Sequence, residues 1–138
     1  MYYLLDTGFW IALYNPAKEP KRNSEAETIA ELIENEKIII PFPTLYEFLN
    51  SKFSRKEYVH RFEKLISRPN FIKVYDKDYR DKALESFFIN KSQTINDVSL
   101  VDEVIKAMIE DVNLKVDFLV TFDDGLKNFA LSKGITTI

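Results

Sequence analysis

The chain has 138 residues, of which 46% are hydrophobic, so it is long enough to bury one substantial core. It has no cysteine and a single histidine, which excludes disulfides and thiolate metal sites and argues against imidazole-rich zinc sites. Its 22 acidic and 19 basic residues give a net charge of -3, which argues against a protein that coats nucleic acid by charge alone.

The composition predicts one domain over residues 1–138. With 3 Gly and 5 Pro, the sequence contains no low-complexity tract, repeat or linker-like stretch. The apolar N-terminal segment carries Asp6 and no positive leader, and we interpret it as a buried first strand. Since no run is long and uncharged enough to span a bilayer, we expect a soluble, cytoplasmic protein with no membrane segment.

Five short apolar runs are typical of interior parallel strands, because their hydrophobic residues are continuous. They occupy residues 2–5, 37–40, 71–75, 117–121 and 134–138. Helical spacing of apolar residues, or position between strands, predicts helices near residues 26–33, 44–53, 55–67, 77–90, 100–112 and 124–132. This alternation predicts right-handed crossovers and an α/β fold, a three-layer α/β/α sandwich around a five-stranded parallel sheet.

Four acidic residues from distant segments fall where an apolar run ends or a helix begins: Asp6, Glu47, Asp102 and Asp123. The carboxyl ends of parallel strands meet at one edge of a sheet, so these side chains are expected to converge. Clustered carboxylates repel one another unless they are protonated or bridged by a cation. Oxygen ligands favour Mg²⁺ or Mn²⁺ over zinc or copper, and the pattern therefore predicts a pocket for such an ion.

Two of these acids also have local structural explanations. Asp6 is able to cap a short helix that begins near Gly8 or Phe9. Glu47 forms with Thr44 the S/T-x-x-E spacing of a capping box, which accounts for both residue types without any ligand. Only convergence with the other acids favours a functional role for Glu47.

The other two acids have similar alternatives. Ser99 and Asp102 form another capping pair, and Asp97 or Asn96 is a good N-cap for the same helix. Asp123 follows a strand and precedes the last helix, where an Asp caps free amides. Asp124 is able to do the same, and we choose Asp123 for the site because it lies nearest the strand.

The segments LLDTGFWIALYNP, PTLYEFLN, SLVDEVIKAMIE and FLVTFDDGL resemble, in this order, the PIN domain family, including the VapC-like toxins of toxin-antitoxin pairs. The resemblance covers essentially the whole chain. It implies a five-stranded parallel sheet between helices and Mg²⁺- or Mn²⁺-dependent hydrolysis of RNA phosphodiester bonds. Attack by a metal-activated water predicts products with a 5′-phosphate and a 3′-hydroxyl. The family's four acids would correspond to Asp6, Glu47, Asp102 and Asp123.

The sequence departs from the family pattern at Gly8, where many members carry Ser or Asn, and at Gly125 and Leu126, where Asp-Phe is commoner. Thr7 and Thr121 remain as candidates to orient a ligand or a water. A strand-end hydroxyl with a purely structural role is the alternative for both.

The resemblance also implies partners. An acidic pocket repels RNA, so phosphate contacts are expected from the locally cationic segment 52–68, with Lys52, Arg55 and Lys56 nearest to Glu47; the alternative is an ordinary solvated helix face. Family members often form homodimers, and toxin members bind a small antitoxin.

Other classes of protein compete with the nuclease hypothesis. A non-catalytic metal- or RNA-binding regulatory module would keep the same fold. A phosphoacceptor receiver domain would need a Lys at the end of a late strand, and a haloacid-dehalogenase-like phosphatase would need D-x-D, which Gly8 interrupts.

Overall fold

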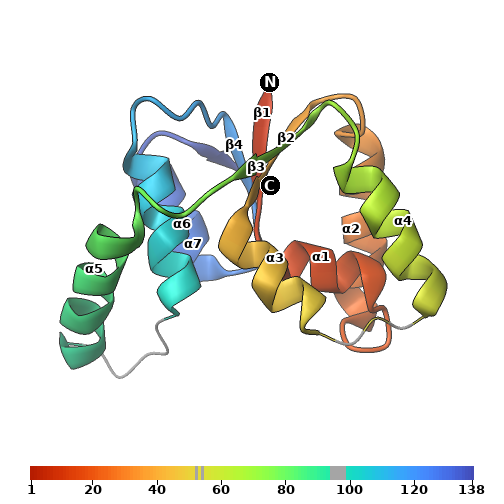
Figure 1. Cartoon of the computed structure of the whole chain (residues 1–138), viewed down its shortest axis with the longest axis horizontal. Helices are drawn as coiled ribbons and strands as arrows, with labels where there is room; N and C mark the ends of the chain where they lie inside the picture. The colour runs from red at the N-terminus through yellow and green to blue at the C-terminus, as the bar shows by residue number, and fades with distance from the viewer. Residues whose placement is uncertain (52, 54, 94–98) are drawn as a thin grey trace.

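A computed structural model of the chain, which describes every residue except 52, 54 and 94–98, has five parallel strands in one sheet (Figure 1). The strands are β1 (Tyr2–Leu5), β2 (Lys37–Pro41), β3 (Phe71–Val74), β4 (Phe118–Val120) and β5 (Thr136–Thr137). Their order across the sheet is β3-β2-β1-β4-β5, and every neighbouring pair is parallel. The predicted α/β fold with a five-stranded parallel sheet is confirmed.

Helices cover both faces of the sheet. They are α1 (Thr7–Tyr14), α2 (Pro20–Leu32), α3 (Phe42–Leu49), α4 (Lys56–Ile66), α5 (Arg80–Gln93), α6 (Leu100–Glu110) and α7 (Asp124–Ser132). Figure 1 shows α1, α2 and α4 on one side of the sheet and α5, α6 and α7 on the other, with α3 next to α1. In the described part of the chain, no helix is long and apolar enough to cross a membrane.

The strands are apolar on both faces because each face packs against helices. Successive side chains of a strand point to opposite faces of the sheet. Leu5, Ile38, Ile40 and Val120 pack with α1 to α4, whereas Leu4, Ile39 and Leu119 pack with α6 and α7. Burial on both sides explains why these strands are continuous hydrophobic runs in the sequence.

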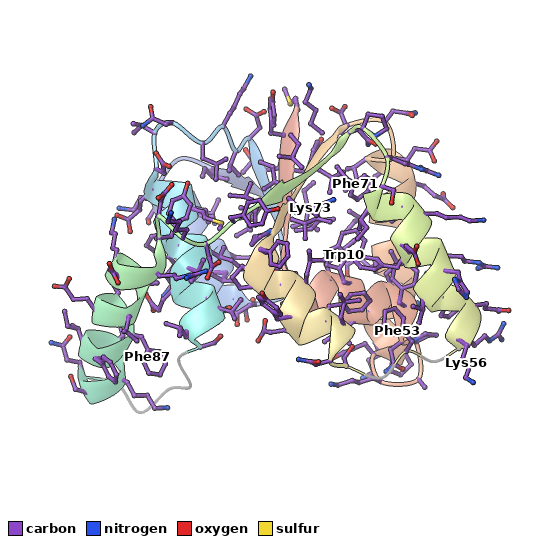
Figure 2. The ribbon with its side chains drawn as sticks, viewed as in Figure 1. Trp10, Phe53, Lys56, Phe71, Lys73 and Phe87 are labelled. Atoms are coloured by element: carbon purple, nitrogen blue, oxygen red, sulfur yellow. The ribbon has the colours of Figure 1, made fainter. Side chains whose placement is uncertain are left out.

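An aromatic cluster fills the core on the side of α1 and α4. Trp10 lies at its centre, 5.3 Å from Phe62 and 6.4 Å from both Phe48 and Phe71 between ring centroids. Figure 2 shows Trp10 and Phe71 between the sheet and α4. Phe62 is fully buried here, and the half-buried Tyr58 packs against the same cluster, so both side chains serve the core.

Two helices begin earlier than expected from the sequence: α2 at Pro20 rather than near residue 26, and α3 at Phe42 rather than near residue 44. A proline lies at N1 or N2 of both α2 and α3, where a missing N–H costs nothing. As a result α3 begins at Phe42 with Pro41 as its N-cap. Thr44 therefore lies inside the first turn, and the predicted capping box between Thr44 and Glu47 is wrong.

Candidate metal centre

A pocket of about 490 Å³ opens where β1 and β4 end and where α1, α6 and α7 begin. The register of the two strands pairs Leu5 with Val120, so the residues that follow them are neighbours at the carboxyl edge of the sheet. All four acids selected from the sequence line this pocket: Asp6, Glu47, Asp102 and Asp123. The parallel topology thus brings together acids that lie far apart in the sequence.

Asp6 is the most deeply placed of these acids, with 6% of its surface exposed. Its Oδ1 accepts a hydrogen bond from the Phe9 amide at 3.2 Å, so it is the N-cap of α1. Its Oδ2 accepts a hydrogen bond from the Thr121 hydroxyl. The side chain therefore caps a helix and lines the pocket at the same time, and the structural and functional interpretations do not exclude each other.

Thr121 links two of the acids. Its buried Oγ1 donates to Asp6 and accepts from the Asp123 amide at 3.0 Å. Asp123 in turn caps α7, because its Oδ1 accepts from the Leu126 amide at 2.9 Å. Thr121 thus fixes both the orientation of Asp6 and the backbone position of Asp123.

Glu47 is exposed on α3 and faces the pocket from its rim. Its Oε1 accepts a hydrogen bond from the Thr7 hydroxyl at 2.6 Å. Because the helix begins earlier than expected, Glu47 makes no capping interaction. Gly8 also lines the pocket, and a Cβ at this position would meet only Asp6 Oδ1, at 3.6 Å, so a small side chain would fit.

Asp102 lies in the first turn of α6 and is half-buried. Ser99 is the N-cap, and its hydroxyl accepts from the Asp102 amide at 3.3 Å. The cap uses only the backbone of Asp102, and no described residue donates a hydrogen bond to its carboxylate. Asp97 and Asn96, the other caps considered from the sequence, lie outside the described residues.

Burial and the neighbouring carboxylates perturb two of the acids. Burial first, and then the charges of Asp123, Asp6 and Glu47, raise the pKa of Asp102 to about 7. Burial also raises the pKa of Asp6 to about 6, although its hydrogen bonds from Thr121 and Phe9 oppose the shift. Groups that share a pocket and disfavour one another's ionisation form a site at which a cation would be stabilising.

The donor set fits a hard divalent cation, since it consists of carboxylate oxygens. The arrangement is nevertheless open, because no three acidic or histidine side chains among the described residues are placed to hold one ion together. Glu47 and Asp123 instead accept hydrogen bonds from Thr7 and from the α7 amide. An ion would therefore require these two side chains to turn inward, and the exposure of Glu47 makes its rotation easy.

Two further hollows lie next to the acid pocket. Asp102, Ser99 and Asp123 also line a smaller hollow that contains Glu103 and Lys106, and these two residues line a groove of about 340 Å³ between α5 and α6. Glu103 is only 3% exposed and accepts hydrogen bonds from Asn90 at 2.9 Å and from Lys106 at 3.3 Å. The acid pocket, the smaller hollow and the groove are therefore neighbours that share lining residues.

The basic residues expected to contact RNA lie elsewhere. Arg55 and Lys56 are exposed at the start of α4 and do not line the acid pocket, and Figure 2 shows Lys56 at the outer end of that helix. Arg55 pairs with Glu57 at 3.3 Å. Lys52 lies outside the described residues. The basic side chain that lines the pocket in the described part of the chain is instead Arg22, in the first turn of α2. The expected helix began only at Ala26, so no sequence signal pointed to Arg22.

The fold and the site together define a class of protein. It has a parallel α/β sheet whose carboxyl edge carries an acidic pocket suited to a divalent cation. Within this class, the family model described as the PIN domain matches residues 3–131, and the chain belongs to the PIN domain family. The sequence has no significant match among curated proteins.

The fold is similar to that of a solved structure. This is a chain in the crystal structure of VapBC2 from Rickettsia felis bound to a DNA fragment from their promoter. The two chains share 18% sequence identity and superpose with a TM-score of 0.63 over 100% of this chain and 98% of the other. The similarity shows that both chains have the same fold.

Proposed function

We propose that this protein is a Mg²⁺- or Mn²⁺-dependent endoribonuclease and the toxin of a toxin-antitoxin pair. One observation carries the proposal: carboxylates from four separate segments share one pocket, in which two of them have a raised pKa. Membership of the PIN domain family supports nuclease chemistry for that pocket.

Asp6, Glu47, Asp102 and Asp123 would hold the ion, with Asp6 and Asp102 at the base and Glu47 closing from the rim. When bound, a divalent cation activates a water and neutralises the charge that develops on a phosphate during in-line attack. Thr121 holds Asp6 and Asp123 in fixed relative positions, and Thr7 orients Glu47 at the rim through a hydrogen bond. No step requires a histidine.

The shape of the surface supports a polymer as the substrate. The acid pocket shares residues with the hollow at Lys106, which shares residues with the groove between α5 and α6. Phe129 in that groove supplies an aromatic ring, which suits stacking by an unpaired base. A single RNA strand is thus able to extend beyond the phosphate that is cleaved.

An antitoxin partner and a homodimer are also part of the proposal, and both derive from the resemblance to VapC-like toxins. The structural neighbour belongs to a complex named VapBC2. We expect this chain to act in the cytoplasm, where its RNA substrates are found. Co-purification with the product of a neighbouring gene would test for a partner directly.

The enzymatic proposal is tested by incubating structured and single-stranded RNA with the purified protein in Mn²⁺, Mg²⁺ or EDTA. We expect cleavage by the wild type in Mn²⁺ or Mg²⁺, and loss of cleavage in EDTA and in Asp6→Asn. Asp81→Asn, an exposed acid on α5 outside the pocket, is the matched control and should cleave normally. Equal cleavage by Asp6→Asn would contradict the proposal, and RNA binding without cleavage would favour a regulatory module.

A further inference from the structure

Arg22 gives the acid pocket a positive charge. It is the one basic side chain among the described residues that line this pocket. The residue lies in the first turn of α2, and Figure 1 shows α2 on the opposite side of β1 from α6, which carries Asp102. Arg22 therefore lines the pocket from a different side of the sheet than Asp102.

The guanidinium of Arg22 is not committed to another protein group. Its ion pair is with Glu19, at 3.9 Å and between two partly exposed side chains, a geometry that contributes little. Among the described residues, it makes no hydrogen bond and no ion pair with any of the four acids. The N–H donors of Arg22 are thus open to an anion that enters the pocket.

The guanidinium of Arg22 lies over an aromatic ring. Its guanidinium carbon lies 5.1 Å from the centroid of the Phe122 ring. Phe122 is held between Thr121 and Asp123, which belong to the hydrogen-bonded chain described above. A guanidinium placed over a ring keeps its N–H groups available, and their geometry matches two oxygens of a phosphate.

From this geometry we infer that Arg22 binds a phosphate of the RNA backbone at the acid pocket. The inference rests on the proposed ribonuclease function and adds the residue that overcomes repulsion between the four carboxylates and an approaching polyanion. Arg22 would hold the non-bridging oxygens of the phosphate and place its phosphorus beside the acids. It is a substrate-binding residue supplied by α2, distinct from the basic segment at the start of α4.

A purely structural role for Arg22 makes a different prediction. If its charge served only to lower the repulsion between the acids, its removal would change stability but not the salt dependence of RNA binding. Each phosphate contact made by a basic side chain contributes about 0.7 to the slope of log Kd against log salt for a single strand. Salt dependence therefore separates the two roles.

The test compares Arg22→Gln with Lys21→Gln, because Lys21 is the adjacent basic residue, is exposed and does not line the pocket. Binding of a labelled single-stranded RNA is measured by fluorescence anisotropy at several salt concentrations, in the Asp6→Asn background so that the RNA stays intact. We expect Arg22→Gln to reduce the slope by about 0.7 and Lys21→Gln to leave it unchanged. Arg22→Lys keeps the charge and should retain the slope with weaker binding.

Cleavage kinetics of the single variants complete the test. Arg22→Gln should lower kcat/KM about 10- to 100-fold, a range typical of losing one charged contact to the substrate. An unchanged salt slope in Arg22→Gln, or no RNA binding by the Asp6→Asn background, would overturn the inference. If the proposed function is wrong, the wild type will show no metal-dependent cleavage. The anisotropy measurements will still show whether Arg22 contacts RNA. Circular dichroism of each variant checks that it folds.

Discussion

Replacing Asp102 by Asn should make the metal-free protein more stable at neutral and alkaline pH. The carboxylate of Asp102 receives no hydrogen bond from the described residues, whereas burial and three neighbouring acids oppose its ionisation. Asn has nearly the same shape and carries no charge, so the substitution removes the repulsion without removing a cap. An acid at this position is thus expected to lower stability.

The size of this effect follows from the raised pKa. One pKa unit corresponds to about 1.4 kcal/mol, so the change from 3.8 to about 7 corresponds to about 4 kcal/mol once Asp102 is ionised. Asp102 keeps some contact with solvent and shares its repulsion with Asp6, so we expect about 2 to 4 kcal/mol at about pH 8. In a chain of this length that is a rise in Tm of roughly 10 °C.

The sign of the pH dependence is fixed by the direction of the shift. Because the pKa of Asp102 is higher in the folded state than in the unfolded state, the folded protein holds the proton more tightly between these two values. The wild type therefore loses stability as the pH rises from about 4 through about 7, and Asp6 contributes in the same direction. At about pH 3 both states are protonated, and the wild type and Asp102→Asn should have nearly equal stability.

Mn²⁺ at a large excess over its Kd should reverse the order of the two proteins. A ligand at 1,000 times its Kd stabilises the folded state by about 4.1 kcal/mol, and only the wild type has the full set of carboxylates to bind the ion. Thermal denaturation of both proteins at several pH values, with Mn²⁺ and with EDTA, measures these effects. A metal-free Asp102→Asn that is no more stable than the wild type at about pH 8 would refute the reasoning.

Three further predictions concern residues around the pocket and the core. Thr44→Val should raise the free energy of unfolding by about 1 kcal/mol in urea denaturation, because the buried Thr44 hydroxyl has no partner among the described residues. Thr121→Val should lower RNA cleavage or Mn²⁺ affinity about 10- to 100-fold, because it removes the hydroxyl that orients Asp6. Charge reversal at Arg55 and Lys56 should weaken RNA binding if the start of α4 contacts RNA.

Each of these predictions has a result that would contradict it. A loss of stability in Thr44→Val would mean that the hydroxyl has a partner such as a water. Normal activity in Thr121→Val would show that Asp6 keeps its orientation without the hydroxyl. Charge reversal at Lys37, at the amino end of β2 and far from the acids, is the control for the variants at Arg55 and Lys56. If it weakens RNA binding equally, the effect is one of general charge.

The sheet was predictable because its strands are buried on both faces. The run at Ile38–Ile40 shows no polar alternation, and the structure buries all of its side chains. The segment from Thr7 to Tyr14 was harder to interpret, since apolar residues surround the whole helix and give no amphipathic period. Only the cap at Asp6 indicated a helix start there.

The site was partly predictable for the same reason. A parallel topology gathers strand ends at one edge, and this rule was enough to select the four acids that line the pocket. The role of Thr44 was misjudged because a capping box depends on where the helix starts, which tertiary packing and Pro43 decided. The position of Arg22 depends on the approach of α2 to Phe122, a contact 100 residues apart in sequence that no local pattern encodes.

Anomalous scattering from crystals soaked in Mn²⁺ is the measurement that tests the central claim most directly. We predict a strong peak in the pocket, within coordination distance of Asp6 and Asp102, with the Glu47 side chain turned inward from Thr7. The peak should weaken or vanish in crystals of Asp102→Asn. A map without Mn²⁺ at the acids, or with the ion bound only elsewhere on the surface, would contradict the account.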